Sequence, residues 1–211
     1  LARRREITPA EADAVAREFL KRAGEETQIL LERGARRWGF LHLTFQEFFA
    51  AAGLHAAERF EEEAIRHLFD PRWEEVLRLG VGYLALVQVR PEAARRFVEG
   101  VLRHMEKGGR APLNILPRKH QALAALLAAD AGDDLPRDLQ SEIARTFTRW
   151  VLDMPDDIAG RVLADIGLTD FARHVASLLE AALKDREELR RTRAARALGA
   201  LQAEGAVPAL L

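Results

Sequence analysis

The strongest constraint on the fold is that strand-like alternation occurs in a single stretch of the chain, residues 28–43. This stretch reads QILLERGARRWGFLHL, two apolar runs separated by a short turn. Alternation in the second run puts Trp38, Phe40 and His42 on one face of a strand. We therefore expect one β-hairpin here, with helices on both sides of it.

The segment before the hairpin has the signals of a well-delimited helix. TPAEADAVAREFLKRAG begins with Thr8 as N-cap, a proline at the first helical position and Glu11 three residues after the cap. Val15 and Phe19 fall at helical spacing, and Gly24 is expected to end the helix. A helix, a hairpin and a further helix together form the second half of a winged helix.

Everything after the hairpin has helical periodicity. Thr44 and Glu47 predict a capping box for the next helix, and Asp70 is the expected cap of the helix in DPRWEEVLRLGVGYLALV. The connections are mostly short, so neighbouring helices should pack as antiparallel hairpins. The small residues of RTRAARALGAL, followed by AVPALL, suit a stacked two-helix repeat.

These patterns predict a mostly α fold: a partial winged helix with one β-hairpin, followed by an α-helical superhelical array. We expect the end of the winged-helix domain at residues 1–56, a helical array at 57–183 and the start of repeats at 184–211. Because the chain begins with Leu1 and stops inside an apolar run, we also expect it to be part of a longer polypeptide.

Composition argues against several classes of function. The net charge is −1, with 32 basic and 33 acidic residues, so no overall charge attracts nucleic acid or an anionic membrane. No apolar run approaches a membrane span. The absence of cysteine excludes disulfides, thiolate metal sites and a cysteine nucleophile, and it fits a cytoplasmic location.

Few residues qualify for chemistry. The six histidines are scattered without metal-binding spacing, so no metal ligand is predicted. No G-x-x-x-x-G-K-[ST] motif occurs, so the chain lacks the loop that cradles phosphates and no catalytic residue is predicted. The run Glu61, Glu62 and Glu63 is interpreted as a solvated helix face. Arg190 and Arg193 suggest either an acid-binding patch or a solvated face with pairs such as Glu187–Arg191.

His42 is the candidate binding residue. It lies just before a predicted helix N-terminus, where free backbone N–H groups and about half a positive charge favour anions. A histidine placed there can donate a proton to a phosphate oxygen. The alternative interpretation is a partly buried histidine bonded to a backbone carbonyl.

The stretch FLHLTFQEFFAA resembles the segment that closes the winged-helix domain of NACHT-type STAND NTPases, the group of the NOD-like receptors and many bacterial defence proteins. The residues that match this pattern are Phe40, His42, Thr44, Phe45, Gln46, Glu47, Phe48, Ala50 and Ala51. The C-terminal stretch resembles short bacterial HEAT repeats. The residues that match there are Arg191, Ala194, Ala195, Ala197, Leu198, Gly199, Val207, Pro208, Leu210 and Leu211.

The resemblance implies that His42 contacts the β-phosphate of ADP in the full-length protein and holds its closed, inactive state. It implies an ATP/ADP switch with Mg²⁺ in an upstream NACHT core, a protein ligand or elicitor on the helical array, and oligomerisation of the full-length protein. This segment itself would bind no cofactor and hydrolyse no ATP. A role in bacterial antiviral defence fits such a signalling protein.

Two other functions remain open on the sequence. The chain can be a stand-alone helical scaffold that binds protein partners, in which FLHLTFQEFF serves only folding. It can also be a winged-helix nucleic-acid binder, since the predicted wing carries Arg33, Arg36 and Arg37. The preceding helix has mixed charge and many alanines, which does not favour nucleic acid.

Overall fold

The structure is a computed structural model in two compact units, Leu1–Ala50 and Ala51–Leu211. Each unit is described by itself. The division lies inside one helix, α2 (Leu43–Ala56). The described residues are 8–34, 37–68, 70–106, 119–153 and 157–205.

The first unit begins with the predicted helix, α1 (Pro9–Thr27), and its predicted cap. The Thr8 hydroxyl accepts from the Glu11 N–H at 3.3 Å, and the Glu11 carboxylate accepts from the Thr8 N–H at 2.8 Å. This reciprocal pair is the capping box expected from the sequence.

The predicted end of α1 at Gly24 is wrong. The helix continues to Thr27 and ends where Gln28 adopts a left-handed conformation, with a φ of 55°. Gly24 has another role: a β-carbon there would lie 2.9 Å from the Leu30 carbonyl oxygen and 3.1 Å from the Trp38 ring. The glycine lets the hairpin approach the helix closely.

A single antiparallel hairpin follows, as predicted, in the described part of the chain. Its strands are β1 (Leu30–Glu32) and β2 (Trp38–Phe40), with Leu31 opposite Gly39. The Leu41 N–H donates to the Ile29 carbonyl at 2.8 Å, which extends the pairing by one residue. The regular strands are thus shorter than the predicted range of 28–43.

The described residues of the first unit form almost no interior. None of the residues of α1 is buried, and its apolar side chains Val15 and Phe19 are 62% and 67% exposed. The predicted helical spacing of these residues is correct, but their apolar face is not covered by the described residues of the unit.

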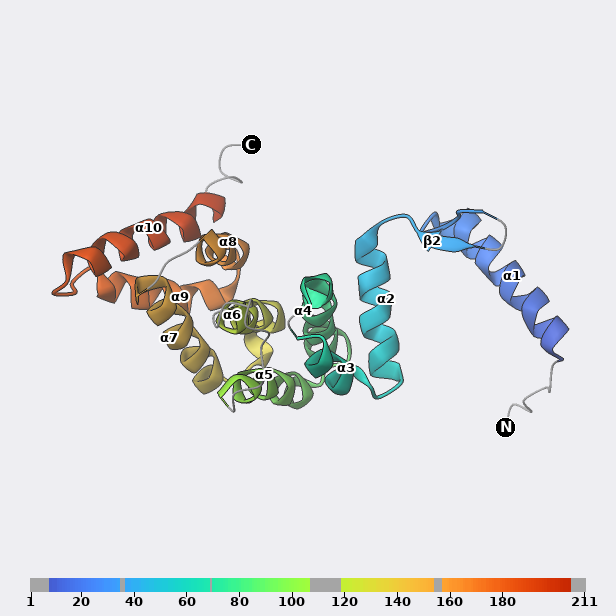
Figure 1. Ribbon diagram of the computed structural model, residues 1–211, viewed down its shortest axis with the longest axis horizontal. Coiled ribbons are helices and arrows are strands. Elements are labelled where there is room, and N and C mark those ends of the chain that lie inside the picture. Colours follow the sequence, from blue (N-terminus) through green and yellow to red (C-terminus); the bar gives the residue numbers. More distant parts are fainter. Residues whose placement is uncertain (1–7, 35–36, 69, 107–118, 154–156, 206–211) are drawn as a thin grey trace. The chain divides into compact units, whose positions relative to one another are not determined.

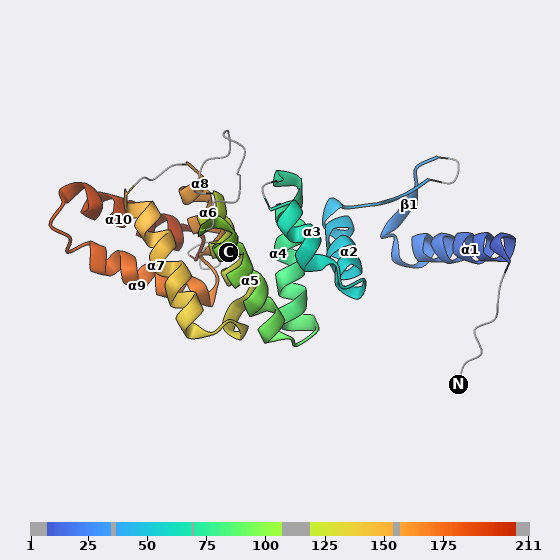
Figure 2. The same ribbon diagram turned by 60° about the horizontal axis from the view of Figure 1, so that its bottom comes forward.

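The second unit is an array of helices (Figure 1, Figure 2), which confirms the mostly α fold predicted from the sequence. It contains the end of α2 (Leu43–Ala56), α3 (Phe60–Arg66), α4 (Glu74–Gly82), α5 (Pro91–Glu106), α6 (Lys119–Ala131), α7 (Arg137–Asp153), α8 (Asp157–Ile166), α9 (Asp170–Ala182) and α10 (Glu188–Gly205). A 3-10 turn, Pro71–Trp73, leads into α4, and a π-helical turn, Tyr83–Val87, follows it.

Helix α6 is the centre of the second unit. Residues 122–129 are all buried, and α6 contacts α4, α5, α7, α8 and α9. Figure 1 and Figure 2 both show it among its neighbours α5, α7 and α8. A helix that is apolar on all sides is stable only when other helices surround it, and the sequence QALAALLAADA has this character.

The helix caps and apolar faces of the second unit largely follow the sequence. Asp70 caps the turn before α4 by accepting from the Arg72 N–H at 3.0 Å. Leu77 of α4 and Phe97 of α5 lie on the buried faces of these helices. Residues 207–211, which the sequence assigns to the HEAT-like repeat, lie outside the described residues.

Candidate functional site

His42 lies between the end of β2 and the first residue of α2. The chain bends at residues 41–42, and the helix begins at Leu43. The prediction that His42 continues the strand face of Trp38 and Phe40 is therefore wrong, because β2 has already ended. The predicted N-cap at Thr44 is also wrong, since Thr44 lies inside the first turn of α2.

Aromatic stacking holds the connection around His42. The rings of Phe40 and Phe49 stack with centroids 5.5 Å apart, which ties the end of β2 to α2. Phe48 meets Phe49 edge-on at 5.5 Å. The His42 ring is 6.1 Å from Phe45 at an angle of 49°. These contacts fix the place where the strand passes into the helix.

The His42 side chain is exposed, and no hydrogen bond to it is recorded among the described residues. The neighbouring apolar residues are exposed as well; Leu43 is 65% exposed and Phe49 is 48% exposed. His42 in this unit is thus not the buried, carbonyl-bonded histidine of the alternative interpretation. Its ring lies beside the N-terminal turn of a helix of 14 residues, where an anion would be favoured.

The arginines of the predicted wing differ in their surroundings. Arg33 donates to the Phe40 carbonyl at 3.2 Å, so its guanidinium braces the hairpin. Arg37 is exposed, and Arg36 lies outside the described residues. This use of Arg33 gives no support to the nucleic-acid interpretation.

The histidine bonded to a carbonyl is His55, which the sequence did not single out. Its Nε2 lies 3.0 Å from the Gly80 carbonyl oxygen, so Nε2 must carry the proton that it donates. Its ring stacks on Phe60 with centroids 3.9 Å apart. Burial lowers the pKa of His55 below its ordinary value. The apolar residues on both sides of His55 in α2 are the sequence signal that could have identified it as a partly buried histidine.

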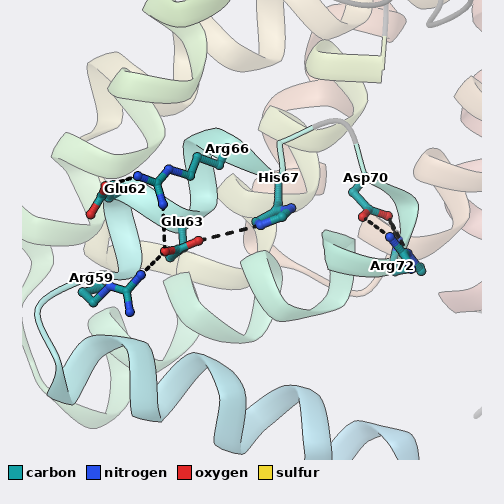
Figure 3. A network of polar contacts seen from close by, with 7 residues as sticks. All are labelled: Arg59, Glu62, Glu63, Arg66, His67, Asp70 and Arg72. Atoms are coloured by element: carbon teal, nitrogen blue, oxygen red, sulfur yellow. Dashed lines mark hydrogen bonds and ion pairs between the residues drawn. The ribbon is translucent and has the colours of Figure 1, made fainter.

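One of the three consecutive glutamates is not on a solvated face. Figure 3 shows Glu63 between Arg59, Arg66 and His67. The Glu63 side chain is only 12% exposed, and it accepts from Arg66 at 3.2 Å. Glu61 and Glu62 are exposed, as predicted. The prediction is wrong for Glu63, because its side chain lies on the inner side of α3 and forms the centre of an ion-pair cluster.

Figure 3 also shows the neighbouring pair of Asp70 and Arg72. The Arg72 guanidinium donates to the Asp70 carboxylate at 2.8 Å and 3.0 Å. These hydrogen bonds lower the pKa of Asp70 to about 2. His67 stacks on Trp73 at 4.1 Å, nearly parallel. All of these groups have partners within the chain, which makes this cluster structural.

The arginines near the start of α10 are also used internally. Arg193 donates to the carbonyls of Leu152 and Asp153, at 2.7 Å and 2.6 Å. Arg190 lies 3.4 Å from the Asp153 carboxylate. Arg191 donates to backbone carbonyls near the start of the helix. Within the described residues, Arg191 makes these backbone hydrogen bonds and does not form the predicted ion pair with Glu187.

Within the described residues, no group of three or more His, Asp or Glu side chains is arranged to hold a metal ion. The helices searched there include none with the length and apolar character needed to cross a membrane. No protein-family model, curated protein or solved structure matches the chain.

Proposed function

We propose that residues 1–56 close the winged-helix domain of a NACHT-type signalling NTPase, and that His42 contacts the β-phosphate of ADP in the intact protein. The proposal begins from the motif FLHLTFQEFFAA. The observation that carries it furthest is the exposed His42 ring directly before the first turn of α2.

The chemistry of this position suits a phosphate. An imidazole N–H can donate to a phosphate oxygen, and the free N–H groups of a helix N-terminus add favourable potential. The stack of Phe40 on Phe49 fixes the backbone that carries His42. A donor on a fixed backbone loses less conformational entropy when it binds than one on a loose loop.

One histidine and one helix end do not make a complete nucleotide site. The sequence has no P-loop, so the phosphate cradle and the Mg²⁺ site would belong to an NTPase core elsewhere in the polypeptide. The exposed side chains of Leu43, Phe45 and Phe49 next to His42 supply an apolar surface that such a core would cover. In this account the chain is a regulatory part of a cytoplasmic ATP/ADP switch and has no ATPase activity alone.

The helical array would be the sensor of the same protein, with a protein ligand or elicitor as its partner. A second candidate function is a helical scaffold that binds proteins without any nucleotide. The exposed Val15 and Phe19 on α1 favour this alternative, because an uncovered apolar helix face is suited to a protein partner.

The two functions differ in what the polypeptide carries when it is purified. We expect a polypeptide that contains this segment and its upstream sequence to retain ADP through gel filtration, and the 211-residue chain alone to bind ADP weaker than micromolar. A nucleotide-free polypeptide, with no P-loop motif upstream, would support the scaffold and contradict the switch.

A further inference from the structure

A pocket of about 390 Å³ lies between α8 and α10 in the second unit. Small-molecule sites commonly have volumes of about 300–1,000 Å³ and mostly apolar walls. The apolar side chains that line this pocket are Val151, Ala159, Leu163, Leu189, Ala197 and Ala200. Its floor belongs to the core of the unit, since Val151, Ala159 and Leu163 are buried.

The pocket exists because small residues face it. Gly160 on α8 lines the pocket, and a β-carbon added to it would meet no atom within 4 Å. Ala197 and Ala200 face the pocket from α10. Larger side chains at these positions would fill the space between the two helices.

The mouth of the pocket carries two arginines, Arg193 and Arg196, one turn apart on α10. Arg193 is held by its hydrogen bonds to the carbonyls of Leu152 and Asp153. Arg196 is exposed, and in the described part of the chain no hydrogen bond or ion pair of its guanidinium is recorded. An available cation therefore lies beside an apolar cavity.

We propose that the α8–α10 pocket binds a small amphipathic carboxylate. The aliphatic chain of the ligand lies on the apolar floor, and its carboxylate pairs with Arg196. Burial of the chain supplies most of the affinity, while the guanidinium selects an acid over an alcohol of the same length. The pocket belongs to the unit Ala51–Leu211, so this site does not depend on the nucleotide role of His42.

The probe is octanoate, titrated into the 211-residue chain below its micelle concentration. Binding is measured by the chemical shifts in nuclear magnetic resonance spectra of the chain. We expect saturable shifts centred on α8 and α10. Octanol should bind about three- to tenfold more weakly, because it lacks the charge that pairs with a partly solvated arginine. Acetate should give no saturable shift, because it has no chain to bury.

Variants locate the site. Gly160→Leu should abolish the octanoate shifts because it fills the pocket, and Gly199→Leu is the matched control. Like Gly160, Gly199 is a glycine inside a helix, here α10, and a β-carbon added to it would meet no atom within 4 Å. Unlike Gly160, it does not line the pocket. Arg196→Gln should weaken octanoate about three- to tenfold and leave octanol unchanged.

Three results would overturn the proposal: no saturable shifts on α8 and α10, full binding by Gly160→Leu, or equal binding of octanoate and octanol with no effect of Arg196→Gln. Thermal unfolding verifies that each variant is folded. If Gly160→Leu is not folded, Ala200→Leu is used instead, because it fills the same pocket from α10. Octanoate binding that is retained by the Ala200→Leu variant would also contradict the proposal.

Discussion

The Nε2 atom of His55 lies 3.0 Å from the Gly80 carbonyl oxygen, and this contact joins the end of α2 to α4. Because the carbonyl only accepts, the ring is bound in a form with the proton on Nε2. The ring is also half-buried against Phe60. His55 is thus a structural histidine, and its titration should change the stability of the second unit.

The first prediction is a pH dependence of stability from His55. Burial lowers the pKa of this histidine below 6.5 in the folded chain, so between that lowered pKa and 6.5 the unfolded chain binds more protons. The free energy of unfolding should therefore fall as the pH drops below 6.5 toward the folded pKa. His55→Gln keeps an N–H donor but does not titrate, so urea unfolding at several pH values should show a flatter profile. An unchanged slope would mean that His55 does not carry this effect.

The second prediction concerns Gly80. A β-carbon on Gly80 would lie 2.2 Å from the Phe60 ring. Since the ring is buried, it has little room to move, and Gly80→Ala should lower the free energy of unfolding by about 1–3 kcal/mol. The control is Gly100→Ala in α5, where the added carbon meets nothing within 4 Å. It should stabilise the helix by about 0.5–1 kcal/mol in the same urea titration. Equal effects of the two variants would refute the predicted contact.

The third prediction concerns the contact of Arg193 with the end of α7. Arg193→Met keeps the aliphatic part of the side chain but removes the hydrogen bonds to Leu152 and Asp153. We expect a loss of about 1–3 kcal/mol in unfolding free energy, as for hydrogen bonds to charged groups. The matched Arg196→Met variant should stay within about 0.5 kcal/mol of the wild type. If both variants are neutral, α10 is held by apolar packing alone.

Local signals in the sequence predicted much of the fold. The Thr8 capping box and the Asp70 cap need only neighbouring residues, so they could be recognised without tertiary information. The apolar pattern on all sides of α6 fits its central position, but this position was not predicted from the sequence. The single hairpin followed from alternation that occurs in one stretch only.

Tertiary contacts account for what the sequence did not predict. Gly24 has the pattern of a helix end, but it is needed for the approach of Trp38, and the left-handed residue that ends α1 is Gln28. Glu63 has the same sequence environment as its exposed neighbours, and only the packing of α3 shows which glutamate is turned inward. The role of His55 likewise depends on a tertiary contact, since its carbonyl partner is 25 residues away in the chain.

The most direct test of the proposed function is the rate of ADP release from the full-length polypeptide with His42→Leu. One hydrogen bond to a charged group contributes about 1.5–3 kcal/mol, so its loss should speed ADP release about ten- to a hundredfold and raise basal signalling. Gln46→Ala is the control, because this exposed neighbour belongs to the same motif without a predicted phosphate contact.

The exposed position of His42 also predicts that thermal unfolding of the 211-residue chain changes little in His42→Leu. The decisive measurement is stopped-flow release of a fluorescent ADP analogue from the full-length wild type and the two variants. The account predicts fast release from His42→Leu and wild-type release from Gln46→Ala. Unchanged release from His42→Leu, together with a large loss of thermal stability in the chain, would show that His42 is a structural residue and contradict the proposed function.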